Sequence, residues 1–509
     1  MRKFLFAFLT GATLCWLASP AAQADVTPHA LFGDGMVVQR DMPIVVWGKA
    51  DPGEKVEVAF NFKGGVEADR KGEATADKDG KWQVTLEKVV LTTPAPADSK
   101  PAKGTLTING KNKIAINDVY LGDVWVCSGQ SNMEMHLDSC NHAKEDKAAA
   151  ANSNIRLFTV PKQAAEEPKT EFAETKNKLE SKWLECGPET VGSFSAVGYY
   201  FGRDVQKAER IPIGLIHSSW GGTIAEAWAT RASIEGNPDL KAMVANPLNS
   251  EPRNPNRATV LYNGMICPLQ PFPIKGAIWY QGESNAGRAY QYRTLFPTMI
   301  QSWRDSWKQP DLPFYFVQLA PWDPRYDPMV KQPADSAWAE LREAQLLTSE
   351  KPHTGMAVIT DTVPAAQAKD IHPKEKEPVG ARLALCARAL AYHDKVEYSG
   401  PLYDKMTIDG NKAILTFTHV SKGLEAKGLD SKGDALEGFT VAGEDKQFHD
   451  AKAEIKGDKV VVTCDKVEKP VAVRFGWTNF PIMNLFNKDG LPATPFRTDD
   501  FPMVTGPKK

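Results

Sequence analysis

The sequence predicts an α/β protein with a parallel β-sheet that is covered by helices on both faces, and with additional β segments at both ends of the chain. Between about residues 119 and 395, short apolar strands alternate with helices that carry an apolar stripe, a rhythm typical of such a sheet. On either side of this region, short alternating strands separated by turn residues predict sandwich-like β structure. A chain of 509 residues is also too long for a single hydrophobic core.

The first 24 residues are expected to be a secretory signal peptide. Arg2 and Lys3 precede an apolar run that ends at Trp16, and an Ala-Gln-Ala cleavage signature closes the segment. The alternative, an N-terminal membrane anchor, would require a longer apolar run. We therefore expect an exported protein, periplasmic or secreted, with no membrane span after cleavage. The mature chain then divides into an N-terminal β domain (25–118), a central α/β domain (119–395) and a C-terminal β domain (396–509).

The expected elements follow in chain order. In the N-terminal domain, alternating strands are expected at residues 44–47, 56–60, 82–86 and 105–108. In the central domain, strands are expected at 124–127, 155–158, 213–216, 276–280, 314–317 and 356–359, and helical stripes within 194–208, 338–345 and 379–390. In the C-terminal domain, strands are expected at 413–417, 439–441, 460–463 and 471–475. The Lys/Glu-rich stretches 141–154 and 162–182 are interpreted as solvated excursions.

Charge and cysteine usage exclude several classes of protein. The chain carries 61 Lys and Arg against 63 Asp and Glu, so it lacks the basic excess of a nucleic-acid-binding protein. Six cysteines remain after removal of the signal peptide, and in an exported protein an even number permits disulfides, whose pairing the sequence leaves open. The absence of a CxxC pair argues against a zinc ribbon or a thioredoxin-type redox site.

Polar segments end four of the expected core strands or follow them closely. They are residues 128–133, 217–223, 280–285 and 370–373. Because ligands bind beyond the carboxyl ends of strands in such sheets, we expect these segments to form one site. Ser131 is expected at a strand-to-helix turn behind Gly129, where its own N–H can help to hold an oxyanion. The alternative is that Ser131 only caps a helix.

The other segments complete the set for acyl transfer. Asp370 lies two residues before His372, and a carboxylate beside an imidazole can fix its tautomer and stabilise the imidazolium. Gly221 and Gly222 permit close approach of a backbone N–H to a reacting carbonyl oxygen. Gln281 offers a side-chain amide donor. The alternatives are a loop histidine without a role, a plain strand-exit turn, and an amide that satisfies loop backbone groups.

At these four segments the sequence resembles the sialate O-acetylesterase family of the SGNH hydrolases. The four matching blocks are residues 129–133, 219–228, 279–285 and 370–373. Further similarity is found at residues 31–40, 194–199 and 338–345. The resemblance implies an SGNH-type, flavodoxin-like sheet and a serine acyl-enzyme mechanism. The implied reaction is removal of O-acetyl groups from a sugar or glycan, above all sialate 9-O-acetyl groups, without metal or cofactor.

The resemblance also implies roles for individual residues. Ser131 is the implied nucleophile, His372 the base and then the acid, and Asp370 its acidic partner. The implied oxyanion donors are the N–H groups of Ser131 and Gly222 and the side chain of Gln281. The residues expected to bind substrate are Gln130, Thr223, Glu283 and Asn285.

Two details of the site stay open at this point. Asp361 or a backbone carbonyl is an alternative to Asp370 for orienting His372. The adjacent glycines leave the register of the oxyanion donor open by one residue.

Other functions remain as alternatives. The same blocks would serve an acetyl xylan or other polysaccharide acetylesterase, with specificity in loop 321–333, where Arg325 could pair with a sialate carboxylate. A non-catalytic carbohydrate-binding protein on a decayed hydrolase fold would fit exposed aromatic residues such as Trp477, although the complete catalytic set argues against it. An amidase or protease would use the same triad. The sequence leaves the oligomeric state open, and we expect the flanking β domains to brace the core.

Overall fold

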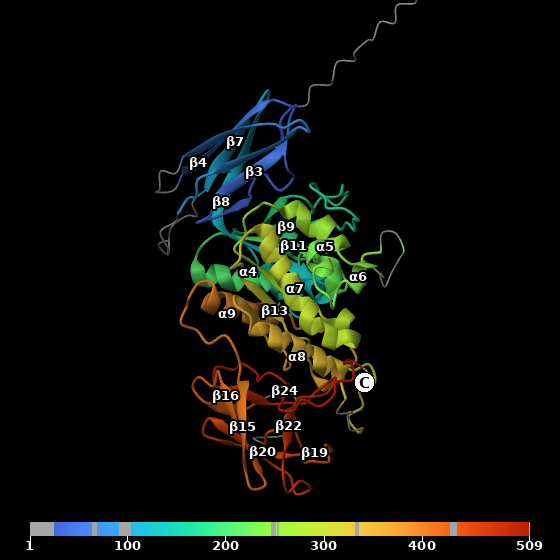
Figure 1. Ribbon diagram of the computed structural model, residues 1–509. Helices are drawn as coiled ribbons and strands as arrows, with labels where there is room; N and C mark the ends of the chain where they lie inside the picture. The colour runs from blue at the N-terminus through green and yellow to red at the C-terminus, as the bar shows by residue number, and fades with distance from the viewer. Residues whose placement is uncertain are drawn as a thin grey trace, which may run out of the picture.

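The computed structural model describes residues 25–63, 69–90, 103–245, 251, 254–330, 335–427 and 435–507. The predicted signal peptide lies outside the described residues. Three parts follow one another along the long axis of the molecule: an N-terminal β part, a central α/β part and a C-terminal β part (Figure 1). Among the described residues, none of the helices combines the length and the apolar character that a membrane crossing requires.

The N-terminal part consists of two sheets that share one buried core. A three-stranded sheet has the order β1 (Thr27–Pro28), β3 (Ile44–Lys49) and β6 (Lys81–Leu86). It packs against β4 (Lys55–Lys63), β5 (Arg70–Thr75), β7 (Lys103–Asn109) and the first half of β8 (Lys113–Gly129). Alternation of buried and exposed residues along β6, with Trp82, Val84 and Leu86 inside, confirms the strand predicted there.

Strand β8 connects the N-terminal sheet to the central sheet. Residues 113–120 pair antiparallel with β7, and residues 123–129 pair parallel with β11 (Ile213–Ser219). The expected boundary between residues 118 and 119 therefore falls inside one continuous strand. The short strand β2 (Val37–Gln39) pairs parallel with Tyr120–Gly122 at the same junction. The division of the chain into domains stays a prediction.

The predicted parallel sheet is confirmed. Its strands have the order β9 (Asn152–Thr159), β11, β8, β12 (Gly276–Tyr280), β13 (Phe314–Val317) and β14 (Thr354–Ala357). All neighbouring pairs in this run are parallel. If β9 is left aside and β8 is taken as the first strand, the order β11-β8-β12-β13-β14 is the 2-1-3-4-5 order of a flavodoxin-like sheet. The switch point of this order lies between β8 and β12. An antiparallel edge strand, β10 (Trp183–Cys186), follows the polar stretch 162–182 and was not predicted.

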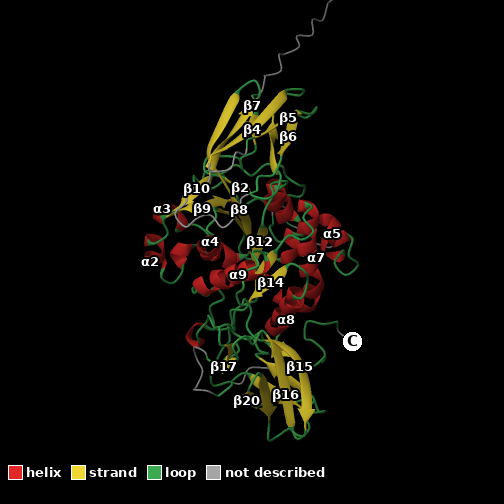
Figure 2. Ribbon diagram, turned by 90° about the vertical axis from the view of Figure 1, so that its left-hand side faces the viewer, coloured by secondary structure: helices red, strands yellow, loops and turns green. Residues whose placement is uncertain are grey.

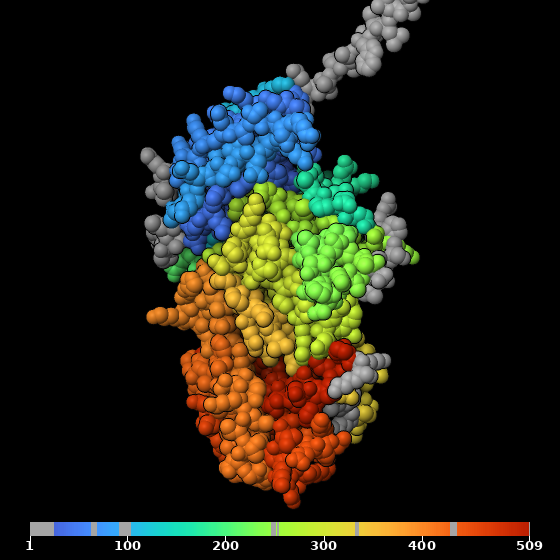
Figure 3. Space-filling model, in the orientation of Figure 1, coloured from blue at the N-terminus to red at the C-terminus, as the bar shows by residue number. Residues whose placement is uncertain are grey.

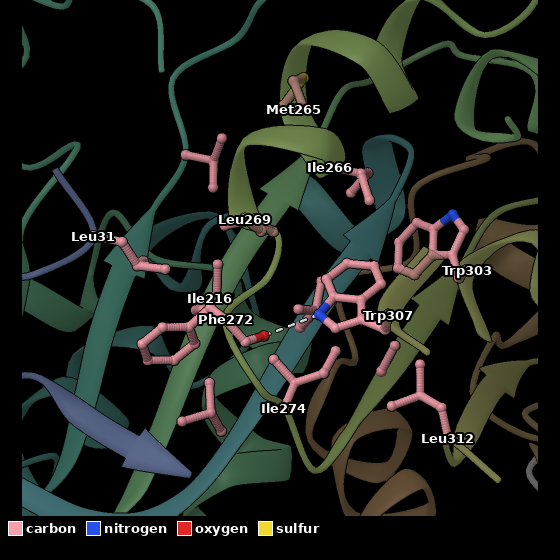
Figure 4. Packing of buried hydrophobic residues seen from close by; sticks show 14 of the residues in the cluster. Leu31, Ile216, Met265, Ile266, Leu269, Phe272, Ile274, Trp303, Trp307 and Leu312 are labelled. Carbon is pink, nitrogen blue, oxygen red and sulfur yellow. Dashed lines mark hydrogen bonds between the residues drawn. The ribbon is translucent and has the colours of Figure 1, made fainter. Parts of the chain in front are cut away.

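Helices cover both faces of this sheet, as predicted (Figure 2). Alternate residues of β12 point to opposite sides, so that Trp279 belongs to one apolar core and Tyr280 to the other. Helices α7 (Ala289–Trp307) and α8 (Ala337–Ser349) pack on the Trp279 side, where Trp307 donates a hydrogen bond to the Phe272 carbonyl at 3.0 Å (Figure 4). Helices α4 (Ala196–Glu209) and α9 (Glu377–Leu390) pack on the Tyr280 side. The remaining short α-helices are α1 (Ser131–Glu134), α2 (Ala143–Ala148), α3 (Pro188–Val191), α5 (Arg231–Glu235) and α6 (Ala242–Ala245).

The C-terminal part contains two four-stranded sheets around a third core. Their orders are β15 (Leu402–Asp409), β16 (Lys412–Thr418), β21 (Lys459–Thr463), β20 (Lys452–Lys456), and β19 (Phe448–Asp450), β18 (Phe439–Ala442), β22 (Ala472–Phe475), β24 (Phe496–Arg497). A third pair joins β17 (Leu424–Ala426) and β23 (Leu485–Asn487). The four predicted strands are confirmed as β16, β18, β21 and β22. Strand β15 escaped prediction because it is largely exposed and polar, which leaves little hydrophobic alternation to read.

One expectation about an individual side chain needs correction. Trp477 was expected to be exposed, but it is buried, with Arg474 and Arg497 guanidinium groups 5.4 and 5.2 Å from its ring centroid. The six cysteines that follow the predicted signal peptide lie within the described residues, and all are free.

Candidate active site

Ser131 lies at the carboxyl end of β8, as the first residue of α1. Gly129 precedes this turn with a φ of +141°, and a Cβ there would lie only 2.2 Å from the Tyr280 carbonyl oxygen. The close approach of β8 to β12 therefore requires glycine at this position. Because Ser131 begins the helix, its N–H has no intrahelical acceptor and remains available beside its own hydroxyl.

His372 lies against Ser131, although 241 residues separate them in the chain. The distance from His372 Nε2 to Ser131 Oγ is 2.8 Å, which is within the range for direct proton transfer. The structure thus brings together the two residues that the sequence placed after different strands. Partial burial, and then the positive charge of Lys376, lower the pKa of His372 below its ordinary value of 6.5, while the charge of Asp370 opposes them.

Asp370 is the carboxylate that lies beside His372. Its Oδ1 accepts a hydrogen bond from the backbone N–H of His372 at 2.9 Å, which fixes the loop that carries the ring. Asp361, the alternative, has both of its carboxylate oxygens bound by the Arg382 guanidinium at 2.6 and 2.7 Å. The geometry therefore favours Asp370 over Asp361 as the acidic partner.

The glycine pair after β11 lies against Ser131. A Cβ at Gly221 would come within 3.3 Å of the Ser131 Cβ, so a larger residue would crowd the nucleophile. The Gly221 N–H donates to the carboxylate of Glu134, whereas the Gly222 N–H has no acceptor within the described part of the chain. Gly222 has a φ of +74° and open space around it. Of the two registers, Gly222 is the one that leaves an N–H free.

Gln281 and Asn285 are buried, and their amide groups bind other protein groups. The Gln281 amide nitrogen donates to the Thr223 carbonyl at 3.2 Å and to Asn285 Oδ1 at 2.6 Å. Asn285 in turn donates to the buried carboxylate of Glu226 at 3.0 Å. Both amide protons of Gln281 therefore have protein acceptors. This placement corresponds to the bracing alternative, and the predicted oxyanion contact of Gln281 and substrate contact of Asn285 stay predictions.

The other predicted binding residues also have protein partners. Thr223 is fully buried, donates to the Trp220 carbonyl at 2.7 Å and accepts from the Trp228 indole at 3.0 Å. Gln130 is buried and accepts from the backbone N–H of Ser284 at 3.3 Å. Glu283 is partly buried, and burial raises its pKa. Contact of these side chains with substrate likewise stays a prediction.

Sequence reasoning missed a buried network behind the serine–histidine pair. Asn132 donates to Glu283 Oε1 at 2.6 Å and to the carbonyl of Ile371 at 3.0 Å, and it accepts from Lys376 Nζ at 2.6 Å. Lys376 is buried, its Nζ lies 5.4 Å from the Tyr280 ring centroid, and burial lowers its pKa to about 8. No sequence pattern indicated a role for Lys376, because the surrounding Lys/Glu run is typical of a solvated surface.

This network joins three of the four sequence blocks, because its members come from the end of β8, the loop after β12 and the histidine loop. Asn132 binds the carbonyl of the residue just before His372, so it fixes the histidine loop relative to Ser131. A cavity of about 290 Å³ is lined in part by Glu134, His136 and His217. Among the described residues, no group of three or more His, Cys, Asp or Glu side chains is arranged to hold a metal ion.

The arrangement as a whole is suited to acyl transfer. The Ser131 hydroxyl contacts an imidazole whose pKa is lowered, and the N–H groups of Ser131 and Gly222 have no acceptor among the described residues. The residues converge at the switch point between β8 and β12, where open α/β sheets bind ligands.

Comparisons with known proteins agree with this geometry. Residues 121–385 match the family described as carbohydrate esterase, sialic acid-specific acetylesterase. Sialate O-acetylesterase from Mus musculus is 32% identical over 432 residues, which cover 75% of this chain and 77% of the mouse protein. The Homo sapiens enzyme of the same name is 30% identical over 495 residues, which cover 91% and 90%.

A solved structure extends the similarity to nearly the whole chain. The crystal structure of a carbohydrate acetylesterase from Xanthomonas citri matches with a TM-score of 0.79 and 38% sequence identity, covering 94% of this chain and 100% of that one. The family match includes Ser131, Gly222 and His372, the residues that the fold brings together. The chain therefore belongs to the sialic acid-specific acetylesterase family of carbohydrate esterases.

Proposed function

We propose that this protein is a serine esterase that removes O-acetyl groups from carbohydrates through an acetyl-enzyme. The 2.8 Å contact between Ser131 Oγ and His372 Nε2 carries this proposal, because it supplies an activated nucleophile at the ligand-binding edge of the sheet. Membership of a carbohydrate esterase family supports the sugar ester as substrate. The flavodoxin-like strand order supports an SGNH-type fold.

In the first half of the reaction, His372 Nε2 takes the proton of Ser131 while Oγ attacks the acetyl carbonyl carbon. The carbonyl oxygen becomes an oxyanion, which the N–H groups of Ser131 and Gly222 stabilise. Each such donor contributes about 3 kcal/mol of transition-state stabilisation. The bond from the acetyl carbon to the sugar oxygen then breaks, and His372 gives its proton to that oxygen.

In the second half, water takes the place of the sugar. His372 removes a proton from the water as it attacks the acetyl carbon of acetyl-Ser131. The tetrahedral species collapses, acetate leaves, and the proton on His372 returns to Ser131 Oγ. Asp370 fixes the histidine loop through the backbone and favours the transient imidazolium by its charge.

Two substrate classes are supported by different observations. The family description and the mammalian relatives support O-acetylated sialic acid, with the 9-O-acetyl group as our first candidate. A second candidate is an O-acetylated neutral oligosaccharide, which is favoured by the acidic lining of a cleft that leads away from the histidine loop. The predicted signal peptide supports an enzyme that meets this substrate in the periplasm or outside the cell.

The decisive assay measures acetate release from a panel of acetylated sugars. We expect the wild-type protein to release acetate from 9-O-acetyl sialic acid or from acetylated xylo-oligosaccharide, and to leave N-acetylglucosamine intact. The physical reason is that the alcohol of an ester is a better leaving group than the amine of an amide, so the same serine–histidine pair cleaves the ester over a lower barrier. Comparable N-deacetylation, or no acetate from any ester, would refute the proposed function.

The acid limb of the pH profile tests His372 as the base. Because the pKa of His372 is lowered, the imidazole stays neutral to lower pH, and we expect the acid limb of kcat/KM to lie below pH 6.5. Lys376→Met removes a cation that disfavours imidazolium, so the pKa of His372 rises and the limb moves to higher pH. We also expect kcat/KM at pH 7 to fall by about tenfold, because Asn132 loses its 2.6 Å partner.

The matched control for this prediction is Lys374→Met, the same substitution at an exposed position of the same loop. It should leave the limb within experimental error of the wild type. A limb that stays in place or moves to lower pH in Lys376→Met would contradict the assignment of His372.

A further inference from the structure

Two joined cavities extend from the histidine loop into the C-terminal part of the molecule. The first, of about 800 Å³, is lined in part by Lys369 and by Asp370, the residue whose carboxylate binds the backbone N–H of His372. The second, of about 620 Å³, lies between the loops after β13 and β14 and the strands β18, β19 and β22. Tyr326, Pro328 and Ala365 line both cavities, so we treat them as one cleft, called the C-terminal cleft below.

The C-terminal part meets the central part at the edge of the sheet where the site lies. The backbone N–H of Trp322, in the loop after β13, donates to the Asn479 carbonyl at 3.2 Å. The Arg342 guanidinium, on α8, donates to the carbonyls of Thr478 and Asn479. The N-terminal sheet instead joins the amino end of β8. In Figure 3 the orange and red C-terminal part directly abuts the yellow central part. Of the two flanking β parts, the C-terminal one therefore lies at the edge of the sheet where the described site residues are.

The walls of the cleft are fixed by contacts within the protein. Trp322 packs against Trp338 with a centroid distance of 4.8 Å, and its indole donates to the Lys369 carbonyl at 3.2 Å. The Asp323 N–H donates to the Ala368 carbonyl at 2.9 Å, which joins the two loops that form one wall. Because the walls of the cleft are already ordered, little conformational entropy is lost when a ligand binds.

The lining combines aromatic surface with polar atoms that lack protein partners. Tyr326, Phe448 and Trp477 contribute aromatic side chains. Glu437 Oε2 and Thr478 Oγ1 are buried atoms of this lining, and neither has a hydrogen-bond partner among the described residues. A carboxylate oxygen that is buried without a donor is costly, and a ligand hydroxyl would satisfy it. Aromatic rings beside hydroxyl-binding groups suit the two kinds of surface that a sugar presents.

The charge of the lining selects between sugar classes. Acidic side chains outnumber basic ones in the cleft, where Asp327, Asp370, Glu437 and Asp450 are lining residues together with Lys369 and Arg474. The Arg474 guanidinium, which also lines it, donates to both carboxylate oxygens of Asp499 at 2.8 and 2.9 Å. A sugar with its own carboxylate would meet like charge there, whereas a neutral sugar would not.

We propose that the C-terminal cleft binds the neutral units of an O-acetylated oligosaccharide whose acetylated unit lies at Ser131. This inference rests on the proposed function, because it assigns the substrate class of the same site. The two cavities that form the cleft are together larger than a single sugar needs. The cleft reaches the histidine loop at Asp370. Glu437 and Thr478 would bind hydroxyl groups of the chain, and Tyr326 would contact a sugar face.

The test compares chain lengths. The probes are acetylated xylose and acetylated xylotetraose. The control substrate is p-nitrophenyl acetate, which is too small to reach the cleft from Ser131. We measure kcat and KM for each of the three. We expect kcat/KM of the wild type to rise about tenfold or more from the monosaccharide to the tetrasaccharide, chiefly through a lower KM. In Glu437→Gln and Thr478→Val we expect most of this rise to disappear, while p-nitrophenyl acetate turnover stays within twofold of the wild type.

Controls separate the possible failures. Glu454→Gln makes the same chemical change on an exposed face of the C-terminal part and should preserve the chain-length effect. Retained p-nitrophenyl acetate turnover shows that each variant is folded. The proposal is overturned if the wild type shows no gain with chain length, if both cleft variants keep the gain, or if acetylated disialic acid is preferred to xylotetraose. If the wild type released no acetate from any of these esters, the proposed function itself would be refuted.

Discussion

Replacing Ser131 by alanine should lower kcat/KM for acetate release by at least about 10⁴-fold, because the substitution removes the atom that forms the acetyl-enzyme. The oxyanion donors are backbone N–H groups and remain in the variant, so a small residual rate above the uncatalysed reaction is expected. His372 loses its 2.8 Å partner but stays fixed by Asp370 and Asn132. The first measurement is acetate release by the wild type and by the variant. The second is the mass of the acetyl-enzyme trapped in the wild type, which should be missing in the variant.

The control for this experiment is Ser139→Ala, an exposed serine eight positions further along the chain. It should retain wild-type turnover and wild-type thermal stability. If Ser131→Ala kept more than about a hundredth of the activity, Ser131 would not be the nucleophile, and the cap interpretation of this residue would gain support. An acetylated peptide that does not contain Ser131 would lead to the same conclusion.

Replacing Asp123 by asparagine should destabilise the junction between the N-terminal and central sheets by about 3–5 kcal/mol, the usual cost of breaking a buried ion pair on one side. Asp123 is 1% exposed and binds the Arg40 guanidinium through two hydrogen bonds of 3.0 Å. It also accepts from the Gln39 amide at 2.7 Å. Asparagine keeps the shape of the carboxylate but removes the charge that binds Arg40 through both hydrogen bonds, and leaves the buried guanidinium with the more distant carboxylate of Asp41, at 3.8 Å.

Thermal and urea unfolding of the wild type and the variant would measure this effect as a shift of the first cooperative transition, since a chain with several cores is not expected to unfold in one step. Asp465→Asn is the matched control. Asp465 is 90% exposed, its pair with Lys452 has an N–O distance of 3.5 Å, and its loss should cost less than about 1 kcal/mol. Equal shifts in the two variants would show that the Arg40–Asp123 pair contributes no more than a surface pair.

The Arg40–Asp123 pair also gives a physical role to the end of segment 31–40, one of the blocks that carried the sequence resemblance. This segment ends in Gln39 and Arg40, and both bind Asp123 at the point where β8 enters the central sheet. From the sequence alone the segment was only a matching block. Its physical role depends on a contact across more than 80 residues, which no local pattern encodes.

Much of the fold was predictable because hydrophobic periodicity is a local property. The continuous apolar runs that became β11, β12 and β13 are buried on both faces, and helices α4, α8 and α9 carry their stripes where expected. The strands that escaped prediction, such as β10 and β15, lie at sheet edges or are largely exposed. Edge strands need less apolar surface, so their pattern is weak.

For the site, the sequence by itself determined which residue types were available: a serine behind Gly129, a histidine after Asp370, and a glycine pair after a core strand. It also placed them after strands of a parallel sheet, which is enough to predict that they share one edge. Only the tertiary structure decided which of them meet. It set Ser131 against His372, bound Asp361 to Arg382, occupied the Gly221 N–H with Glu134, and buried Lys376 behind the pair. The physical reason is that hydrogen-bond partnership depends on distances of a few tenths of an ångström between loops far apart in the chain, whereas periodicity only fixes the strands from which those loops extend.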